Sequence, residues 1–153
     1  MIFEDLFWLT MLDVLVAILC GGAIGLERQL RGKPAGMRTC IIVVLTTALF
    51  ITLGETATDS GSGGDGARVM AGIITGIGFL GAGTIISNRG RIQGITTASL
   101  IWALAAIGIT IGFGYPITAI VTTAIIMSVL ALIDWAERRF PRLRREIDGG
   151  KGE

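Results

Sequence analysis

The sequence predicts an all-α membrane protein, a bundle of about five transmembrane helices with its N-terminus outside the cell and its C-terminus inside. Two observations predict this class. The chain is strongly apolar, with 52% hydrophobic residues and a mean hydropathy of +0.73. Its charged residues also alternate between acidic and basic clusters from one apolar run to the next, and a soluble core gives no reason for that order.

The basic residues predict the orientation of the chain. Of 13 Lys and Arg residues, 12 lie in segments 28–38, 89–91 and 138–151, and only Arg68 lies elsewhere. Basic residues near the ends of transmembrane helices are retained on the cytoplasmic side. We therefore expect these three segments to face inward and the acidic start of the chain, with Glu4 and Asp5, to face outward. Because topology explains the basic residues, they give no reason to expect nucleic acid as a partner.

Five apolar stretches are long enough to cross a bilayer, which takes about 20 residues of helix. They are residues 6–26, 37–54, 68–87, 94–113 and 115–134. An odd number of crossings places the basic C-terminus inside. The first stretch is too long, and lacks the preceding basic residues, for a cleaved signal peptide, so we expect it in the mature protein.

Two connections complete the predicted organisation. Residues 112–116 (Gly-Phe-Gly-Tyr-Pro) predict a tight turn between the last two helices. The glycine-rich segment 55–66 predicts a flexible linker. We divide the chain into a transmembrane domain, residues 1–136, and a basic cytoplasmic tail, residues 137–153.

Glycine is frequent, with 23 residues, and it forms stripes on the predicted helices. At about 100° per residue, Gly72, Gly76 and Gly83 share one face of the third helix, and Gly78 lies on a second stripe. Small residues let membrane helices approach closely, and close packing must hold a bundle together in lipid. We therefore expect the third helix to be central and the protein to form a homo-oligomer, with a dimer favoured. The glycines to which we assign helix packing are Gly21, Gly25, Gly72, Gly76, Gly78, Gly81 and Gly83.

Ionisable residues inside a membrane are rare and costly, so the few in this chain are candidate functional residues. Asp13 lies about a third of the way into the first span. It either reaches water from the outer leaflet or pairs with Arg68, or else it has an ion or proton role. Glu27 and Arg38 end two consecutive antiparallel helices. They can pair across the hairpin as a structural clamp, or one of them can contact a partner directly.

Hydroxyl side chains line one side of the fourth predicted helix. Thr96, Ser99 and Thr110 share that side with Ala103 and Ala106. Hydroxyls can form hydrogen bonds between membrane helices. We therefore interpret this stripe as a packing surface first and as a polar pathway second.

The sequence contains no sign of an active site. It has no His, which is the commonest metal ligand and the usual general base near neutral pH. It also has no nucleotide-binding loop and no metal-ligand spacing. We therefore expect a protein that is not an enzyme and that needs no cofactor or metal. Cys20 and Cys40 fall inside apolar runs, and we interpret them as small packing residues.

Four ordered motifs identify a family resemblance. They are Gly21-Gly-Ala-Ile-Gly-Leu-Glu-Arg-Gln29, Ala35-Gly-Met-Arg-Thr39, Gly76-Ile-Gly-Phe-Leu-Gly-Ala-Gly83, and Gly94-Ile-Thr-Thr-Ala98 followed by Trp102. Over residues 10–133 the chain resembles the MgtC/SapB family of bacterial membrane proteins. The resemblance implies an inner-membrane protein of about five spans, linked in the family to survival under low magnesium and acid stress and to virulence. The family's signature polar positions fall on Glu27, Arg28, Arg38, Thr39 and Thr97.

The chain departs from the family pattern in two places. Well-known members carry a soluble C-terminal domain, whereas this sequence stops after a basic tail. Thr96 stands where virulence-associated relatives have an Asn that is tied to their function, so we include it among the candidate functional residues.

The resemblance and the residues together lead to two functional hypotheses. Some family members are described as acting by protein contact, including inhibition of the ATP synthase through its membrane sector. The first hypothesis is a non-enzymatic regulator that contacts another membrane protein through its helices during magnesium or acid stress. The alternative is a small transporter or channel for Mg²⁺ or a monovalent cation. Asp13, the hydroxyls of the fourth helix and the glycine-rich third helix would line its path.

Overall fold

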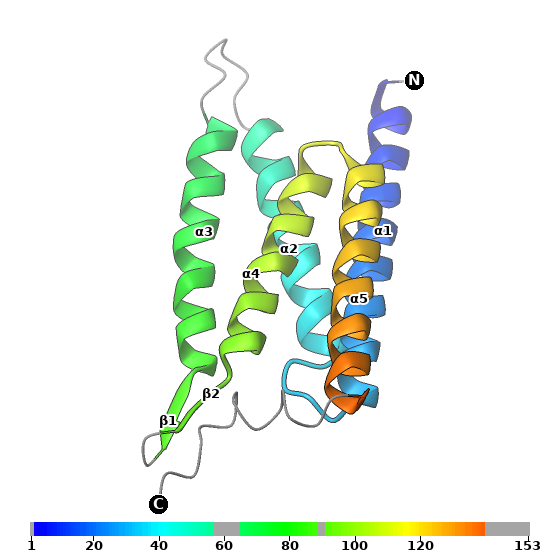
Figure 1. Ribbon diagram of the computed structural model, residues 1–153. Helices are drawn as coiled ribbons and strands as arrows, with labels where there is room; N and C mark the ends of the chain where they lie inside the picture. Colours follow the sequence, from blue (N-terminus) through cyan, green and yellow to red (C-terminus); the bar gives the residue numbers. More distant parts are fainter. Residues whose placement is uncertain (1, 57–64, 89–90, 140–153) are drawn as a thin grey trace, which may run out of the picture.

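The computed structural model of the chain is a bundle of five α-helices (Figure 1). It describes residues 2–56, 65–88 and 91–139. The helices are α1 (Ile2–Leu30), α2 (Met37–Thr56), α3 (Asp65–Thr84), α4 (Ile95–Gly112) and α5 (Pro116–Arg139). The prediction of an all-α protein with five helices is confirmed, and α2 to α5 are each long and apolar enough to cross a membrane. The side of the membrane that each end faces stays a prediction.

A short β-hairpin between α3 and α4 was not predicted. The third span was expected to reach residue 87, but α3 ends at Thr84 and is followed by β1 (Ile86–Asn88) and β2 (Arg91–Gln93). The two strands are antiparallel, with Ile86 opposite Gln93. Gly94 follows β2 with φ of +93°, and a Cβ on it would overlap the carbonyl group of Thr84. The hydropathy run continues past α3 because Ile85 and Ile86 are apolar, although the backbone has already left the helix.

The helix at the centre of the bundle is α4, which packs against all four other helices. In contrast, α3 lies at the edge and packs against α4 and α2 (Figure 1). The expectation that the third helix is central is therefore wrong for the single chain. A stripe of small residues shows that a helix face can be approached closely, but it does not show that a helix of the same chain occupies that face.

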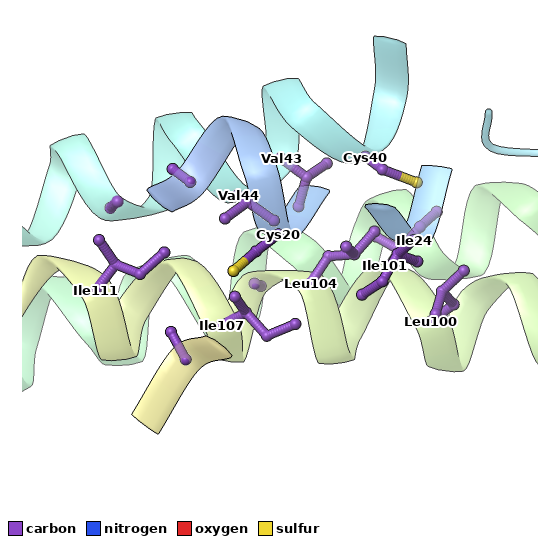
Figure 2. Close-up of a cluster of buried hydrophobic side chains, with 14 of the residues drawn as sticks. Cys20, Ile24, Cys40, Val43, Val44, Leu100, Ile101, Leu104, Ile107 and Ile111 are labelled. Atoms are coloured by element: carbon purple, nitrogen blue, oxygen red, sulfur yellow. The ribbon is translucent and has the colours of Figure 1, made fainter. Parts of the chain in front are cut away.

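Apolar side chains fill the space between α1, α2 and α4. Ile24, Val44, Leu104, Ile107 and Ile111 are fully buried. In Figure 2 the isoleucines and leucines of α4 point toward the valines of α2 and the N-terminal helix. The two free cysteines, Cys20 and Cys40, are buried in the same cluster. This cluster is continuous along the middle of the bundle, and it holds the helices around α4.

The turn between α4 and α5 agrees with the prediction. It runs from Gly112 to Pro116. Gly114 adopts φ of +80°, and its amide donates to the carbonyl oxygen of Ile111 at 2.8 Å. The central residues of the predicted linker, 57–64, and the tail from residue 140 onward lie outside the described residues. The end of α5 at Arg139 means that the helix continues past residue 136.

Candidate functional site

Two signature polar residues meet at the end of the bundle where α1 and α5 end and α2 and α4 begin, which we call the basic end (Figure 1). Arg28, near the end of α1, is only 5% exposed. Its Nη2 donates to Oγ1 of Thr97 in the first turn of α4 at 3.0 Å. The same nitrogen donates to the carbonyl oxygen of Pro34 at 3.2 Å. One side chain therefore joins α1, the α1–α2 loop and α4.

The positive charge of Arg28 has no paired carboxylate among the described residues. Its Nε is buried and has no hydrogen-bond partner. Arg28 lies beyond the apolar stretch of α1. Burial lowers the pKa of its guanidinium, and the neighbouring Glu27 raises it. The group stays charged because an arginine titrates far above neutral pH. A buried cation that forms no direct ion pair is costly.

An ionic cluster of Glu27, Arg31 and Asp134 lies beside Arg28. Nε of Arg31 lies 2.7 Å from Oε1 of Glu27, one helical turn earlier on α1. The Arg31 guanidinium also pairs with Asp134 of α5, so the cluster ties α5 to α1. The expected pair between Glu27 and Arg38 is wrong, because Glu27 pairs through Oε1 with Arg31 of the same helix and Arg38 is exposed. Thr39 is also exposed.

A pocket of about 470 Å³ is lined both by the hydrogen-bonded pair Arg28 and Thr97 and by this ionic cluster. Gly94, which caps the N-terminus of α4, offers no side-chain acceptor to the first amides of the helix. Thr96 is exposed and lines the pocket. The residues around it are Glu27, Arg28, Arg31, Lys33, Pro34, Gln93, Gly94, Thr96, Thr97, Leu130, Ile133, Asp134 and Glu137. Of the candidate polar residues, the fold therefore brings together Glu27, Arg28, Thr96 and Thr97. Sequence reasoning missed Asp134, whose partner Arg31 is distant in sequence.

Asp13 lies away from this pocket. It is partly exposed and lines a separate pocket of about 210 Å³, with Leu45 and Thr52 of α2 among its neighbours. The hydroxyl stripe of α4 does not join helices as expected. Ser99 donates to the carbonyl oxygen of Ile95 at 3.0 Å, and Thr110 donates to that of Ala106 at 2.8 Å. Both hydroxyls therefore bond within their own helix.

Two glycine pairs with the spacing Gly-x-x-x-Gly bring helices into close contact inside the chain. Gly21 and Gly25 of α1 lie against the start of α2, and a Cβ on Gly21 would lie 2.8 Å from the carbonyl oxygen of Cys40. Gly108 and Gly112 of α4 lie against α2 on another side, where a Cβ on Gly112 would lie 2.6 Å from the carbonyl oxygen of Ala48. Sequence reasoning missed the α4 pair, although its four-residue spacing could have indicated it.

The third Gly-x-x-x-Gly pair, Gly72 and Gly76 of α3, has nothing within 4 Å of an added Cβ. Both glycines line an apolar groove of about 710 Å³ between α3 and α2, which we call the α2–α3 groove. The groove is lined by Ile42, Val43, Thr46, Thr47, Phe50, Leu53, Gly54, Val69, Gly72, Ile73, Gly76, Ile77 and Leu80. Gly78 and Gly83 also face open space, but outside the groove, and Gly81 lies against Ala98 of α4.

Comparison with known proteins identifies the family of this chain. Residues 14–139 match the MgtC family. The chain belongs to this family. The MgtC protein of Salmonella typhimurium strain LT2 is 37% identical over 140 residues, which cover 92% of this chain and 59% of that protein. A protein of Escherichia coli K12 named "Putative magnesium transporter YhiD" is 44% identical over 106 residues, covering 66% of this chain and 49% of that protein.

The match to the family has two further aspects. The chain spans about half to three-fifths of the length of these relatives. No solved structure matches it. Together with the four apolar helices, membership of the MgtC family makes this a bacterial membrane protein.

Proposed function

We propose that this protein is a non-enzymatic regulator in the bacterial inner membrane, and that it binds a transmembrane helix of another membrane protein in the α2–α3 groove. Its role would lie in adaptation to magnesium or acid stress, in keeping with the family to which it belongs. Neither a cofactor nor a resident metal is part of this proposal. The protein would regulate its partner by binding the partner helix in this groove.

The observation that carries this proposal is that three glycine pairs share the spacing Gly-x-x-x-Gly but differ in what lies next to them. The glycine pairs of α1 and α4 lie so close to α2 that an added side chain would overlap the backbone of α2. The pair of α3 has the same spacing and lies in an open groove. Close approach of backbones at small residues holds membrane helices together. A groove floored by Gly72 and Gly76 therefore suits a further helix.

The occupant that we propose is a helix from a second membrane protein. The membrane sector of the ATP synthase is one candidate, because the family resemblance implies such a target. A second copy of this chain is the other candidate, and it would give the dimer expected from the sequence. The exposed Phe50 and Leu53 at the groove would add apolar contact area in either case.

Capture from native membranes tests the proposal with a matched pair of variants. Gly76→Leu fills the groove, whereas Gly78→Leu makes the same change on the same helix outside the groove. We expect the native protein and Gly78→Leu to retain the same partner protein, and Gly76→Leu to lose it. Retention of a second copy of this chain alone would assign the groove to a homodimer instead. Because an added side chain has space at both positions, both variants should fold. Equal capture by all three proteins would contradict the proposal.

The alternative function is transport of a small cation, and the name of the YhiD relative supports it. Asp13, a carboxylate of the first predicted span, lines a small pocket together with Thr52 of α2. Against this alternative, fully buried apolar side chains such as Val44, Leu104 and Ile107 occupy the middle of the bundle. Transport would therefore need a path outside the single-chain core.

Flux through liposomes distinguishes the two functions. The native protein and Asp13→Asn are reconstituted at equal density, and the uptake of Mg²⁺ and of a monovalent cation is measured. The regulator hypothesis expects no flux above that of empty liposomes for either protein. Flux that disappears in Asp13→Asn would establish transport instead.

A further inference from the structure

The pocket at the basic end has a lining of balanced charge. It holds three cationic side chains, Arg28, Arg31 and Lys33, and three anionic ones, Glu27, Asp134 and Glu137. A ligand with a net charge would leave an unbalanced charge in a partly enclosed site, which is costly. A zwitterion would bring one charge of each sign and keep the balance.

Three buried atoms in this lining lack hydrogen bonds. One of them, Nη1 of Arg31, is ion-paired with Asp134, and the other two have opposite polarity. Nε of Arg28 is a donor without an acceptor, and Oε2 of Glu27 is an acceptor without a donor. Leaving such groups unsatisfied costs free energy, more so when they are charged. The uncapped N-terminus of α4 at Gly94 lies in the same lining and favours an anionic group. The pocket therefore calls for both an anionic acceptor and a cationic donor.

The pocket also has an apolar wall at the depth of the lipid headgroups. Leu130 and Ile133 of α5 line it beside Asp134. The apolar run of α5 ends at Asp134, and charged residues follow to the end of the helix at Arg139. Such a change from apolar to charged residues marks the membrane interface. A ligand at this position meets hydrocarbon on one side and charged groups on the other.

We propose that the pocket binds the headgroup of phosphatidylethanolamine. Its phosphate faces Arg28, Lys33 and the first turn of α4, and its primary ammonium donates to Glu27. The glycerol and the upper part of the acyl chains lie along Leu130 and Ile133. A primary ammonium fits better than the quaternary ammonium of phosphatidylcholine, because only the former has N–H groups for the unsatisfied carboxylate oxygen.

Lipid binding to the purified full chain in detergent tests this proposal. Phosphatidylethanolamine, phosphatidylcholine and phosphatidylglycerol with identical acyl chains are each added, and retention is measured by native mass spectrometry and by the shift in thermal unfolding. We expect about fivefold greater retention of phosphatidylethanolamine than of the other two lipids, the effect of one charge contact at a headgroup. Equal retention of all three would overturn the proposal.

Variants of the lining provide a second test. Glu27→Gln should reduce the preference for phosphatidylethanolamine over phosphatidylglycerol, and Lys33→Gln should weaken retention of both. Lys33 is exposed, so this variant keeps the test valid even if Glu27→Gln fails to fold. Arg38→Gln is the matched control, because Arg38 is an exposed cation at the same end outside the pocket lining. An unchanged preference in Glu27→Gln, or unchanged retention of both lipids in Lys33→Gln, would count against the site.

A soluble headgroup without acyl chains tests whether the ligand is a membrane lipid. Glycerophosphoethanolamine, which has no acyl chains, should give little or no shift in unfolding. A shift equal to that of the lipid would overturn the assignment to a membrane lipid. The proposal is also independent of the α2–α3 groove. Gly76→Leu should bind phosphatidylethanolamine like the native protein, so the failure of one proposal leaves the other intact.

Discussion

Arg28 and Thr97 are 69 residues apart in the sequence, and their side chains form a buried hydrogen bond of 3.0 Å. The bond joins the end of α1 to the first turn of the central helix. Both residues lie in motifs by which the chain resembles its family. Their direct contact indicates that the two motifs form one structural unit at the basic end.

The first prediction concerns this bond. Thr97→Val keeps the shape of the side chain but removes the acceptor for a buried, charged donor. We expect the free energy of unfolding to fall by about 1.5–3 kcal/mol, the usual worth of a hydrogen bond to a charged group. Denaturant unfolding in detergent, followed by circular dichroism, measures the change. Thr96→Val is the control, because Thr96 is the exposed neighbour; its effect should stay within about 0.5 kcal/mol. Similar values for the two variants would contradict a role for the bond.

The second prediction compares Gly108 and Gly76, each of which belongs to a Gly-x-x-x-Gly pair. A Cβ on Gly108 would overlap the backbone of Val44 and the side chain of Thr47, so Gly108→Ala should destabilise the protein by about 1–3 kcal/mol. A Cβ on Gly76 has open space around it. Gly76→Ala should leave stability unchanged or raise it by up to about 1 kcal/mol, because alanine favours the helix. Unfolding of the monomer in detergent measures both, and a reversed order would refute the packing of α4 on α2.

The third prediction concerns the ion pair between Arg31 and Asp134. The two side chains are 26% and 28% exposed, so solvent screens their attraction. A double-mutant cycle with Arg31→Gln and Asp134→Asn should give a coupling energy of about 0.5–1 kcal/mol. The coupling should decrease as salt is added. A coupling of zero at low salt would show that this contact does not hold α5 on α1.

The fourth prediction concerns orientation. Lys33 lies in the α1–α2 loop at the basic end, whereas Tyr115 lies in the α4–α5 turn. In intact cells, a membrane-impermeant maleimide should label Tyr115→Cys and should label Lys33→Cys only after the membrane is opened. The native cysteines are both buried, so background labelling should be low. Labelling of Lys33→Cys in intact cells would reverse the assignment of the basic segments to the cytoplasm.

Much of the architecture was predictable because hydropathy and turn residues act locally. Apolar runs of about 20 residues predicted the helices, and Gly112 to Pro116 predicted the turn between α4 and α5. The β-hairpin after Thr84 was missed, since Ile85 and Ile86 extend the apolar run while Gly94 redirects the backbone. Local patterns therefore predicted which segments are helical, with errors where an apolar segment leaves the helix.

The sequence by itself determined the class of the protein, the number of its helices and the small-residue faces that they carry. Only the tertiary structure decided that α4 rather than α3 is central, that Arg31 rather than Arg38 pairs with Glu27, and that Arg28 contacts Thr97. The physical reason is that, in a membrane, faces that meet lipid and faces that meet protein are both apolar. Helical periodicity shows which residues share a face, but the packing of the whole bundle selects the neighbour of that face.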